Sequence, residues 1–201
     1  MELNRIEMLS MNNPLRKGLL KHLEFSIFKK LLFQSGIDPR GQTLLDLASG
    51  SGYSNLLIEQ AYQPKQLVTF DVMPEQIRLA AKVPTQVTHR FLGDITALGL
   101  QSEAFDGIFG FGILHHLEDW RAGMAEVVRV LKPGGFLILE EPNGKSAEFF
   151  RRFARYQIPK TGHFTFDELE SQFEQAGLIQ RSWAKVLLPC FRAYVFIKPL
   201  N

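Results

Sequence analysis

Short apolar runs alternate with stretches of helical periodicity along most of this chain. Apolar runs that end in glycine, proline or aspartate are typical of buried strands, whereas apolar positions three and four apart are typical of amphipathic helices. The runs that predict strands lie at 43–47, 66–71, 86–91, 105–112, 136–139, 178–188 and 191–198. Helical patterns separate the first five runs, and this repeated order predicts a doubly wound (Rossmann-like) α/β sheet with helices on both faces.

Ahead of the first strand, the pattern predicts one or two amphipathic helices between Pro14 and Phe33. Their apolar positions repeat every four residues, at Leu15, Leu19, Leu23, Ile27 and Leu31. Their polar positions are mostly basic, namely Arg16, Lys17, Lys21, Lys29 and Lys30, beside the single acid Glu24. Such a face suits an anionic membrane surface or an acidic substrate, and it is also the ordinary solvated face of a helix that covers the sheet edge or the cofactor.

Composition narrows the class of protein. A chain of 201 residues with 45% apolar and 22% charged residues is long enough for one globular domain with a sizeable core. A net charge of +2 does not indicate a nucleic-acid-binding protein, and the single cysteine, Cys190, excludes an internal disulfide and a cysteine-rich zinc site. No segment reaches about 18 uninterrupted apolar residues, so we expect a cytoplasmic protein without a membrane span.

The stretch Thr43 to Asn55, TLLDLASGSGYSN, predicts a buried strand that passes through a glycine turn into a helix. Glycine allows the sharp turn and leaves room for a ligand against the N–H groups at the helix start. Dinucleotide-binding loops carry a third glycine where this chain has Asn55, and Asp46 at the strand end would repel a pyrophosphate. Both features disfavour NAD as the ligand.

Asp71 ends the second predicted strand, 19 residues after Gly52. This is close to the separation of about 20 residues at which a strand-end acid meets ribose hydroxyls in nucleotide-binding α/β folds. The alternative is a surface aspartate that caps the next helix, which begins near Pro74. The position of Asp71 beside the glycine loop favours the ribose role.

Three segments together resemble class I S-adenosylmethionine-dependent methyltransferases, and the type 11 group in particular. The glycine loop is similar to their first motif, with Ala48 in place of its first glycine. Residues 105–119, which include Leu114-His115-His116, resemble that group's fourth-strand segment, and Arg129 to Gly135 (RVLKPGG) is similar to the turn before its fifth strand. The resemblance implies S-adenosyl-L-methionine as cofactor and seven strands, mostly parallel, with the last one antiparallel.

The resemblance also implies which residues would hold the cofactor. These are Asp46, Ala48, Gly50, Gly52, Asp71, Val72, Asp94, Ile95, Gly110 and Phe111. In the family, the residue matching Asp94 lies near the adenine amino group, and the next backbone N–H lies near the ring. Asp94 could instead cap a short helix. Phe111 stands where the family usually has a small polar residue, which leaves only a backbone contact.

His115 and His116 are candidate catalytic residues, because histidine titrates near neutral pH and can act as a general base. A metal site is not expected, since adjacent side chains point in different directions and no partner set with ligand spacing is visible. The alternative for either histidine is a structural one, in which it hydrogen-bonds the loop and packs against the next helix.

Residues 1–201 are expected to form a single methyltransferase domain. It would comprise an N-terminal helical cap (1–40), a cofactor-binding half (41–142), and a part with the substrate lid and C-terminal strands (143–201). The aromatic and basic run 149–156 is the candidate lid, or else a core-facing helix with a basic outer face. Thr165 and Glu168 form a capping box at the start of a later helix.

The expected function is transfer of a methyl group from S-adenosylmethionine to a small-molecule acceptor that is apolar, acidic or both. No Asn-Pro-Pro-Tyr-like motif follows the fourth strand, which counts against nucleobase and glutamine acceptors. One alternative is a protein that binds S-adenosylmethionine without catalysis, as a regulator or partner. Another, an oxidoreductase or epimerase that uses NAD, is disfavoured by Asn55 and Asp46.

Overall fold

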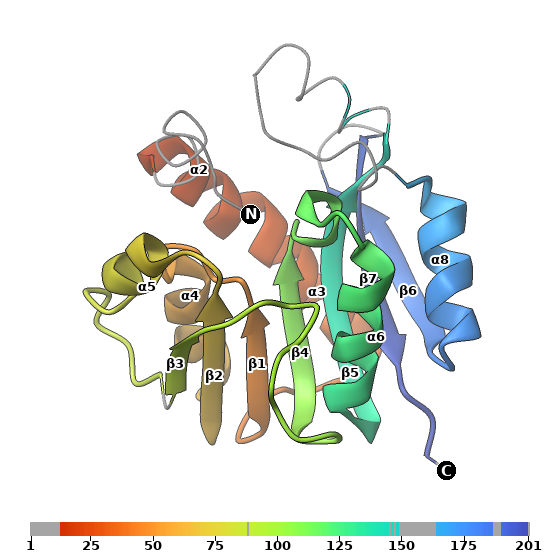
Figure 1. The fold of residues 1–201 in the computed structure, drawn as a ribbon, viewed down its shortest axis with the longest axis horizontal. Coiled ribbons are helices and arrows are strands. Elements are labelled where there is room, and N and C mark those ends of the chain that lie inside the picture. Colours follow the sequence, from red (N-terminus) through yellow and green to blue (C-terminus); the bar gives the residue numbers. More distant parts are fainter. Residues whose placement is uncertain are drawn as a thin grey trace.

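The computed structural model describes residues 13–87, 89–144, 146, 148, 164–186 and 190–200, which build one seven-stranded sheet with helices on both faces (Figure 1). The strands are β1 Thr43–Leu47, β2 Gln66–Asp71, β3 His89–Leu92, β4 Phe105–Phe111, β5 Leu131–Pro142, β6 Ile179–Lys185 and β7 Phe191–Ile197. Their order is β3-β2-β1-β4-β5-β7-β6. The first five are parallel, and β7 is antiparallel to both β5 and β6, which confirms the predicted fold class.

Two apolar clusters fill the space between the sheet and its helices. One cluster joins the sheet to α6 (Trp120–Val130) and α8 (Phe166–Gln175), and the other joins it to α3 (Phe25–Gln34) and α4 (Tyr53–Tyr62). Helix α5 (Pro74–Ala80) follows β2, and the 3₁₀ turn η2 (Leu114–His116) follows β4. Alternate strand residues supply the two clusters, as the period of two in a strand requires.

The N-terminal pattern forms one run of helix with an irregular centre. It consists of α2 (Pro14–Leu19), a π-helical turn η1 (Leu20–Glu24), and α3. Leu20, Phe28 and Leu31 are buried, whereas Leu15 at the outer end is 87% exposed. The lysines at 21, 29 and 30 are exposed, which agrees with the solvated-face alternative; contact with a membrane or an acidic substrate stays a prediction.

Several predicted strand boundaries shift by a few residues, most clearly those of β3 and β5. Strand β3 begins at His89 instead of residue 86. The segment Lys132 to Gly135, predicted as a turn before the fifth strand, lies within β5. The register there shifts from Leu131 opposite Phe105 to Phe136 opposite Gly107, so the extra residues of β5 form a bulge.

Helix α8 has the predicted capping box, since Thr165 and Glu168 each accept the other's backbone N–H. The candidate lid 149–156 lies outside the described residues. Among the described helices, none is long and apolar enough to cross a membrane.

Candidate functional site

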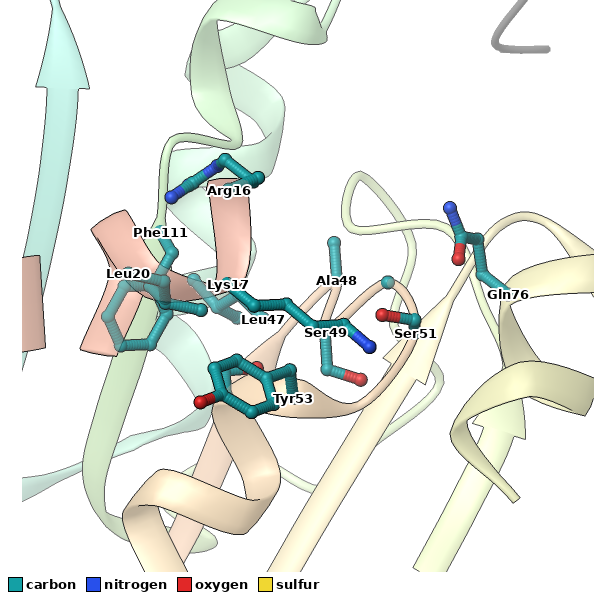
Figure 2. Close-up of a pocket in the computed structure, with 12 residues that line it drawn as sticks. Arg16, Lys17, Leu20, Leu47, Ala48, Ser49, Ser51, Tyr53, Gln76 and Phe111 are labelled. Atoms are coloured by element: carbon teal, nitrogen blue, oxygen red, sulfur yellow. The ribbon is translucent and has the colours of Figure 1, made fainter. Parts of the chain in front are cut away.

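The N-terminal helix lies over the carboxyl ends of β1 and β4, and a pocket opens between them (Figure 2). Its lining comes from the helix, the glycine loop, α4, α5 and the end of β4. The lining residues are Arg16, Lys17, Leu20, Leu47, Ala48, Ser49, Gly50, Ser51, Tyr53, Ser54, Gln76 and Phe111. Ala48, Gly50 and Phe111 were predicted from the sequence. The residues of the N-terminal helix and Gln76 were not, because no local pattern connects them to the loop.

The loop between β1 and α4 has the sharply turned backbone that its glycines predict. Ala48, Gly50 and Gly52 have φ values of 46°, 54° and 80°, in the left-handed region that favours glycine. The Gly52 N–H donates to the Ser49 carbonyl at 2.9 Å, which closes the turn. Gly52 is the N-cap of α4 and supplies no side chain to cap it, and Tyr53 and Ser54 of the first turn line the pocket.

The two loop glycines have different surroundings. A Cβ added to Gly52 would lie 2.9 Å from the Ala80 Cβ, so this glycine allows α4 and α5 to pack closely. A Cβ added to Gly50 would lie 3.9 Å from its nearest neighbour, the Gln76 side chain. The Gly50 position therefore has open space on the pocket side, where a ligand could approach the backbone.

Asp71 ties the glycine loop to the end of β2. Its Oδ2 accepts the Gly50 N–H at 3.0 Å, and its Oδ1 accepts the Met73 N–H at 2.9 Å at the start of α5. Burial raises the pKa of the Asp71 carboxyl, while these backbone N–H groups lower it in part. The structure thus places Asp71 next to the loop. It is buried and accepts the N–H of Met73, the N-cap residue of α5, but α5 has no side-chain cap, so Asp71 is not the surface helix cap of the alternative. Val72 beside it is 37% exposed.

Asp46 lies underneath the loop and does not line the pocket. The side chain is completely buried, and its Oδ2 accepts Ser54 Oγ at 2.5 Å and Asn55 Nδ2 at 2.6 Å. Burial raises the pKa of Asp46 to about 7, although these two hydrogen bonds act in the opposite direction. Asp46 therefore holds the first turn of α4 in place, and Asn55 uses its amide for this contact where a dinucleotide loop would have glycine.

The turn after β3 holds Asp94 and Ile95. Asp94 Oδ1 accepts both the N–H and the hydroxyl of Thr96, at 2.9 and 2.8 Å, so its side chain stabilises the turn. The Ile95 side chain is buried in the core, which leaves its backbone for any ligand contact. The Gly93 N–H donates to the Asp71 carbonyl at 3.0 Å, so this turn is joined to the end of β2.

At the end of β4, Gly110 fits between its neighbours on the sheet. A Cβ on Gly110 would lie 3.3 Å from both Leu47 and Leu139. The Phe111 ring stacks on Phe28 of α3, with 4.6 Å between ring centroids. The aromatic residue thus joins the N-terminal helix to the sheet beside the pocket.

His115 and His116 differ in their surroundings. Glu141, completely buried on β5, accepts the Ile113 and Leu114 N–H groups at 2.9 and 2.7 Å through Oε1, and lies 2.8 Å from His115 Nδ1 through Oε2. Among the residues that the structure describes, His116 Nδ1 has no hydrogen-bond partner. Burial and the adjacent His115 hold the pKa of His116 well below its usual value, so His116 is neutral.

An ion pair joins two turns of the N-terminal helix. Arg16, which lines the pocket, is paired with the buried Glu24 at 2.6 Å. Burial and the nearby Glu24 raise the pKa of the buried Glu140 well above its usual value. None of these acids was predicted as a site residue. In the described part of the chain, no group of three or more histidine, cysteine or acidic side chains could hold a metal ion.

The chain is similar to known methyltransferases in sequence and in fold. A family model described as a methyltransferase domain matches residues 45–139, from β1 into β5. The 2-methyl-6-phytyl-1,4-hydroquinone methyltransferase of Synechocystis sp. is 26% identical over 174 residues, which cover 78% of this chain and 54% of that protein. The ubiquinone/menaquinone biosynthesis C-methyltransferase UbiE of Desulfotalea psychrophila is 29% identical, with 80% of this chain and 68% of that protein covered.

The chain thus spans about half of the length of the Synechocystis relative. Among solved structures, a chain of the Haloferax volcanii complex between the Trm112 methyltransferase activator and a methyltransferase superposes with a TM-score of 0.76. It is 18% identical, and the match covers 92% of this chain and 94% of that one. At this identity, the likeness concerns the fold alone.

Proposed function

Because this chain belongs to the class I S-adenosylmethionine-dependent methyltransferase family, we propose that it binds S-adenosylmethionine at the glycine loop and methylates a small-molecule acceptor. The observation that carries the proposal is the hydrogen bond from the Gly50 N–H to the Asp71 carboxylate. It brings the turned loop and the strand-end acid together beside one pocket, as a nucleoside-bearing ligand would need.

The residues around the pocket fit this cofactor. Gly50 leaves space for a ligand against the loop, Asp71 offers a carboxylate to ribose hydroxyls, and the cations Arg16 and Lys17 suit the carboxylate of a methionyl group. Val72, Asp94 and the Ile95 backbone would then lie toward the ribose and adenine, and Gly110 and Phe111 toward the methionyl part. Asp46 would act through the loop, by supporting α4 from beneath.

The acceptor that we propose has an apolar body and an ionisable hydroxyl, as a hydroquinone has. Two relatives are named for methylation in quinone synthesis or of a phytyl hydroquinone. The Phe111 ring, backed by the buried Phe28, and Arg16 lie on the helix side of the pocket, which suits such a body with a partly negative oxygen.

When bound, S-adenosylmethionine supplies an electrophilic methyl group, and the protein contributes position and exclusion of water. The loop backbone and Asp71 would fix the nucleoside, and the N-terminal helix would cover the pocket. The acceptor would approach from the carboxyl edge of the sheet, where ligands of open α/β sheets bind.

Calorimetry with S-adenosylhomocysteine, S-adenosylmethionine and NAD tests the cofactor. Asp71→Ala should weaken S-adenosylhomocysteine binding by about 1.5–3 kcal/mol, the usual size of a hydrogen bond to a charged group. The 2′,3′-dideoxy analogue should lose much less on the same substitution, since it lacks the diol. Asp106→Asn is the matched control, because Asp106 also accepts a backbone N–H, from Thr43, and lies at the opposite edge of the sheet.

If Asp71→Ala weakens the binding of S-adenosylhomocysteine and of its dideoxy analogue equally, Asp71 acts only by holding Gly50. The assignment of Asp71 to the ribose would then be rejected. Binding of NAD in preference to S-adenosylmethionine would reject the proposed function. Release of S-adenosylhomocysteine with a panel of hydroquinones tests the acceptor class.

A further inference from the structure

We propose that His115, positioned by Glu141, is the general base that removes the hydroxyl proton of the acceptor. The inference rests on the proposed function and deepens it, because it selects one of two adjacent histidines and requires an acceptor with a proton to lose. Glu141 would be a positioning residue, since it acts through His115.

The Glu141 carboxylate accepts hydrogen bonds from the turn after β4. Its Oε1 accepts two backbone N–H groups, and its Oε2 faces the His115 N–H at 3.4 Å and the ring Nδ1 at 2.8 Å. Carboxylate oxygens accept hydrogen bonds, so Oε2 accepts from a proton-bearing Nδ1. In neutral His115 the proton therefore lies on Nδ1, and the lone pair lies on Nε2.

The His115 ring lies against the end of β4. A Cβ on Gly112 would be 3.4 Å from His115 Cε1, the ring atom between the two nitrogens. Gly112 directly follows Phe111, which lines the pocket. The His115 side chain keeps 11% of its surface exposed, so the ring is not completely sealed from solvent.

His116 does not have these features. Its ring centroid is 4.1 Å from that of His115, and its Nδ1 has no partner among the described residues. Among the described residues, Nδ1 of His116 therefore has no acid that could fix the tautomer and stabilise an imidazolium, as Glu141 can for His115. Its environment keeps it neutral, which suits a packing role.

The proposed step is one proton transfer followed by one methyl transfer. The acceptor O–H bond breaks, its proton goes to His115 Nε2, and its electron pair stays on the acceptor. That electron density, at oxygen or at the ring carbon that the oxygen activates, forms the bond to the methyl carbon. Where the carbon is methylated, its C–H bond then breaks, the electron pair restores the aromatic ring, and the oxygen takes a proton back. The carbon–sulfur bond breaks with its pair on sulfur, which gives S-adenosylhomocysteine. One proton is released to solvent for each methyl group transferred, and Glu141 stays ionised throughout.

Glu141→Gln tests the pair with little change to the turn. The glutamine carbonyl can keep the two short bonds from Ile113 and Leu114, and its NH₂ then occupies the place of Oε2. An NH₂ at 2.8 Å from Nδ1 must donate, so His115 has to carry its proton on Nε2, the nitrogen that the base needs free. This substitution reverses the tautomer and leaves the ring in place.

Two measurements follow. Nitrogen-15 NMR of the imidazoles in the full chain should show the Nδ1–H tautomer for His115 in the wild type and the Nε2–H tautomer in the variant. With a hydroquinone such as demethylmenaquinol, Glu141→Gln should lower kcat by roughly 100- to 10,000-fold, the range for loss of a positioned base. Affinity for S-adenosylhomocysteine should stay within about twofold. Glu126→Gln, which alters an acid that also accepts a backbone N–H away from the pocket, should leave kcat unchanged.

The outcomes separate the two proposals. Equal turnover by wild type and Glu141→Gln, with the tautomer reversed, would show that Glu141 only anchors the turn and would overturn the base assignment. A wild-type His115 with its proton on Nε2 would overturn it as well. A wild type that binds S-adenosylmethionine but methylates amines or thiols and no hydroxyl compound would refute the acceptor class, whereas failure to bind the cofactor would reject the proposed function itself.

Discussion

Asp46→Asn should make the protein progressively more stable than the wild type as the pH rises from 5 to 7. Asp46 is completely buried beneath the glycine loop, and burial raises its pKa from 3.8 to about 7. In the unfolded chain the same carboxyl ionises near its ordinary value. At a pH between the unfolded pKa and the folded pKa of Asp46, the wild type must take up a proton when it folds. Its free energy of unfolding therefore falls as the pH rises through this interval. Asparagine has no such requirement.

The structure sets the size of the effect. Each pH unit between the two pKa values costs about 1.4 kcal/mol, so the wild type should lose about 2.7 kcal/mol relative to the variant between pH 5 and 7, and about 4 kcal/mol over the full interval. The asparagine carbonyl can still accept the bonds from Ser54 and Asn55. At low pH, where Asp46 is protonated, the difference in the free energy of unfolding between the wild type and the variant therefore reflects the replacement of the carboxyl OH by NH₂.

Urea unfolding followed by the fluorescence of Trp120 and Trp183 measures the free energy of unfolding at each pH. Asp106→Asn is a control of opposite sign, because Lys132 and the Thr43 N–H lower the pKa of Asp106 despite its partial burial. That variant should lose stability relative to the wild type as the pH rises through the acidic range. If the difference between Asp46→Asn and the wild type stays constant from pH 5 to 7, Asp46 ionises normally in the folded state and the reasoning is refuted.

Two further predictions concern packing and the acid next to Glu141. Gly52→Ala should destabilise the ligand-free protein by about 1–3 kcal/mol, because its Cβ would lie 2.9 Å from Ala80 Cβ at a φ of 80°. Gly50→Ala, with 3.9 Å of clearance, should cost only about 1 kcal/mol for its left-handed backbone, and equal losses in thermal denaturation would contradict the difference. Glu140→Gln should keep its melting temperature better than the wild type between pH 5 and 8, since burial and Glu24 raise the pKa of Glu140; a parallel decline would show that Glu140 is ionised in the folded protein.

The periodic pattern was sufficient for most of the fold. The runs at 43–47 and 66–71 match β1 and β2 residue for residue, because both strands are buried on both faces and end at sharp turns. Lys132 to Gly135 was misjudged, since proline and glycine indicate a turn and only the pairing with β4 shows that the chain continues along the sheet. The start of β3, an edge strand, depends in the same way on its single neighbour.

For the site, the sequence located the loop but not the partners of its acids. Asp46 and Asp71 look alike in the sequence, as aspartates late in successive strands. In the structure, Asp71 bonds the loop backbone from beside the pocket, whereas Asp46 bonds the helix start from below. The difference is one of strand position, because Asp71 ends β2 and Asp46 is still followed by Leu47 within β1. The pairing of Arg16 with Glu24 depends on the irregular π-helical turn, which no local pattern predicted.

Glu140 and Glu141 are adjacent acids at the end of β5, but they have different surroundings and different roles. Successive strand residues point to opposite faces, so Glu140 lies near Glu24 of the N-terminal helix, and Glu141 faces the turn that carries His115. Glu141 meets four donor groups, whereas Glu140 lies beside another acid, and burial and Glu24 raise the pKa of Glu140 and favour its neutral form. The pleat of β5 therefore places a fully hydrogen-bonded acid behind the proposed base, and an acid that favours its neutral form beside the N-terminal helix. This arrangement accommodates two buried acids at the end of one strand because only one of them needs to be ionised.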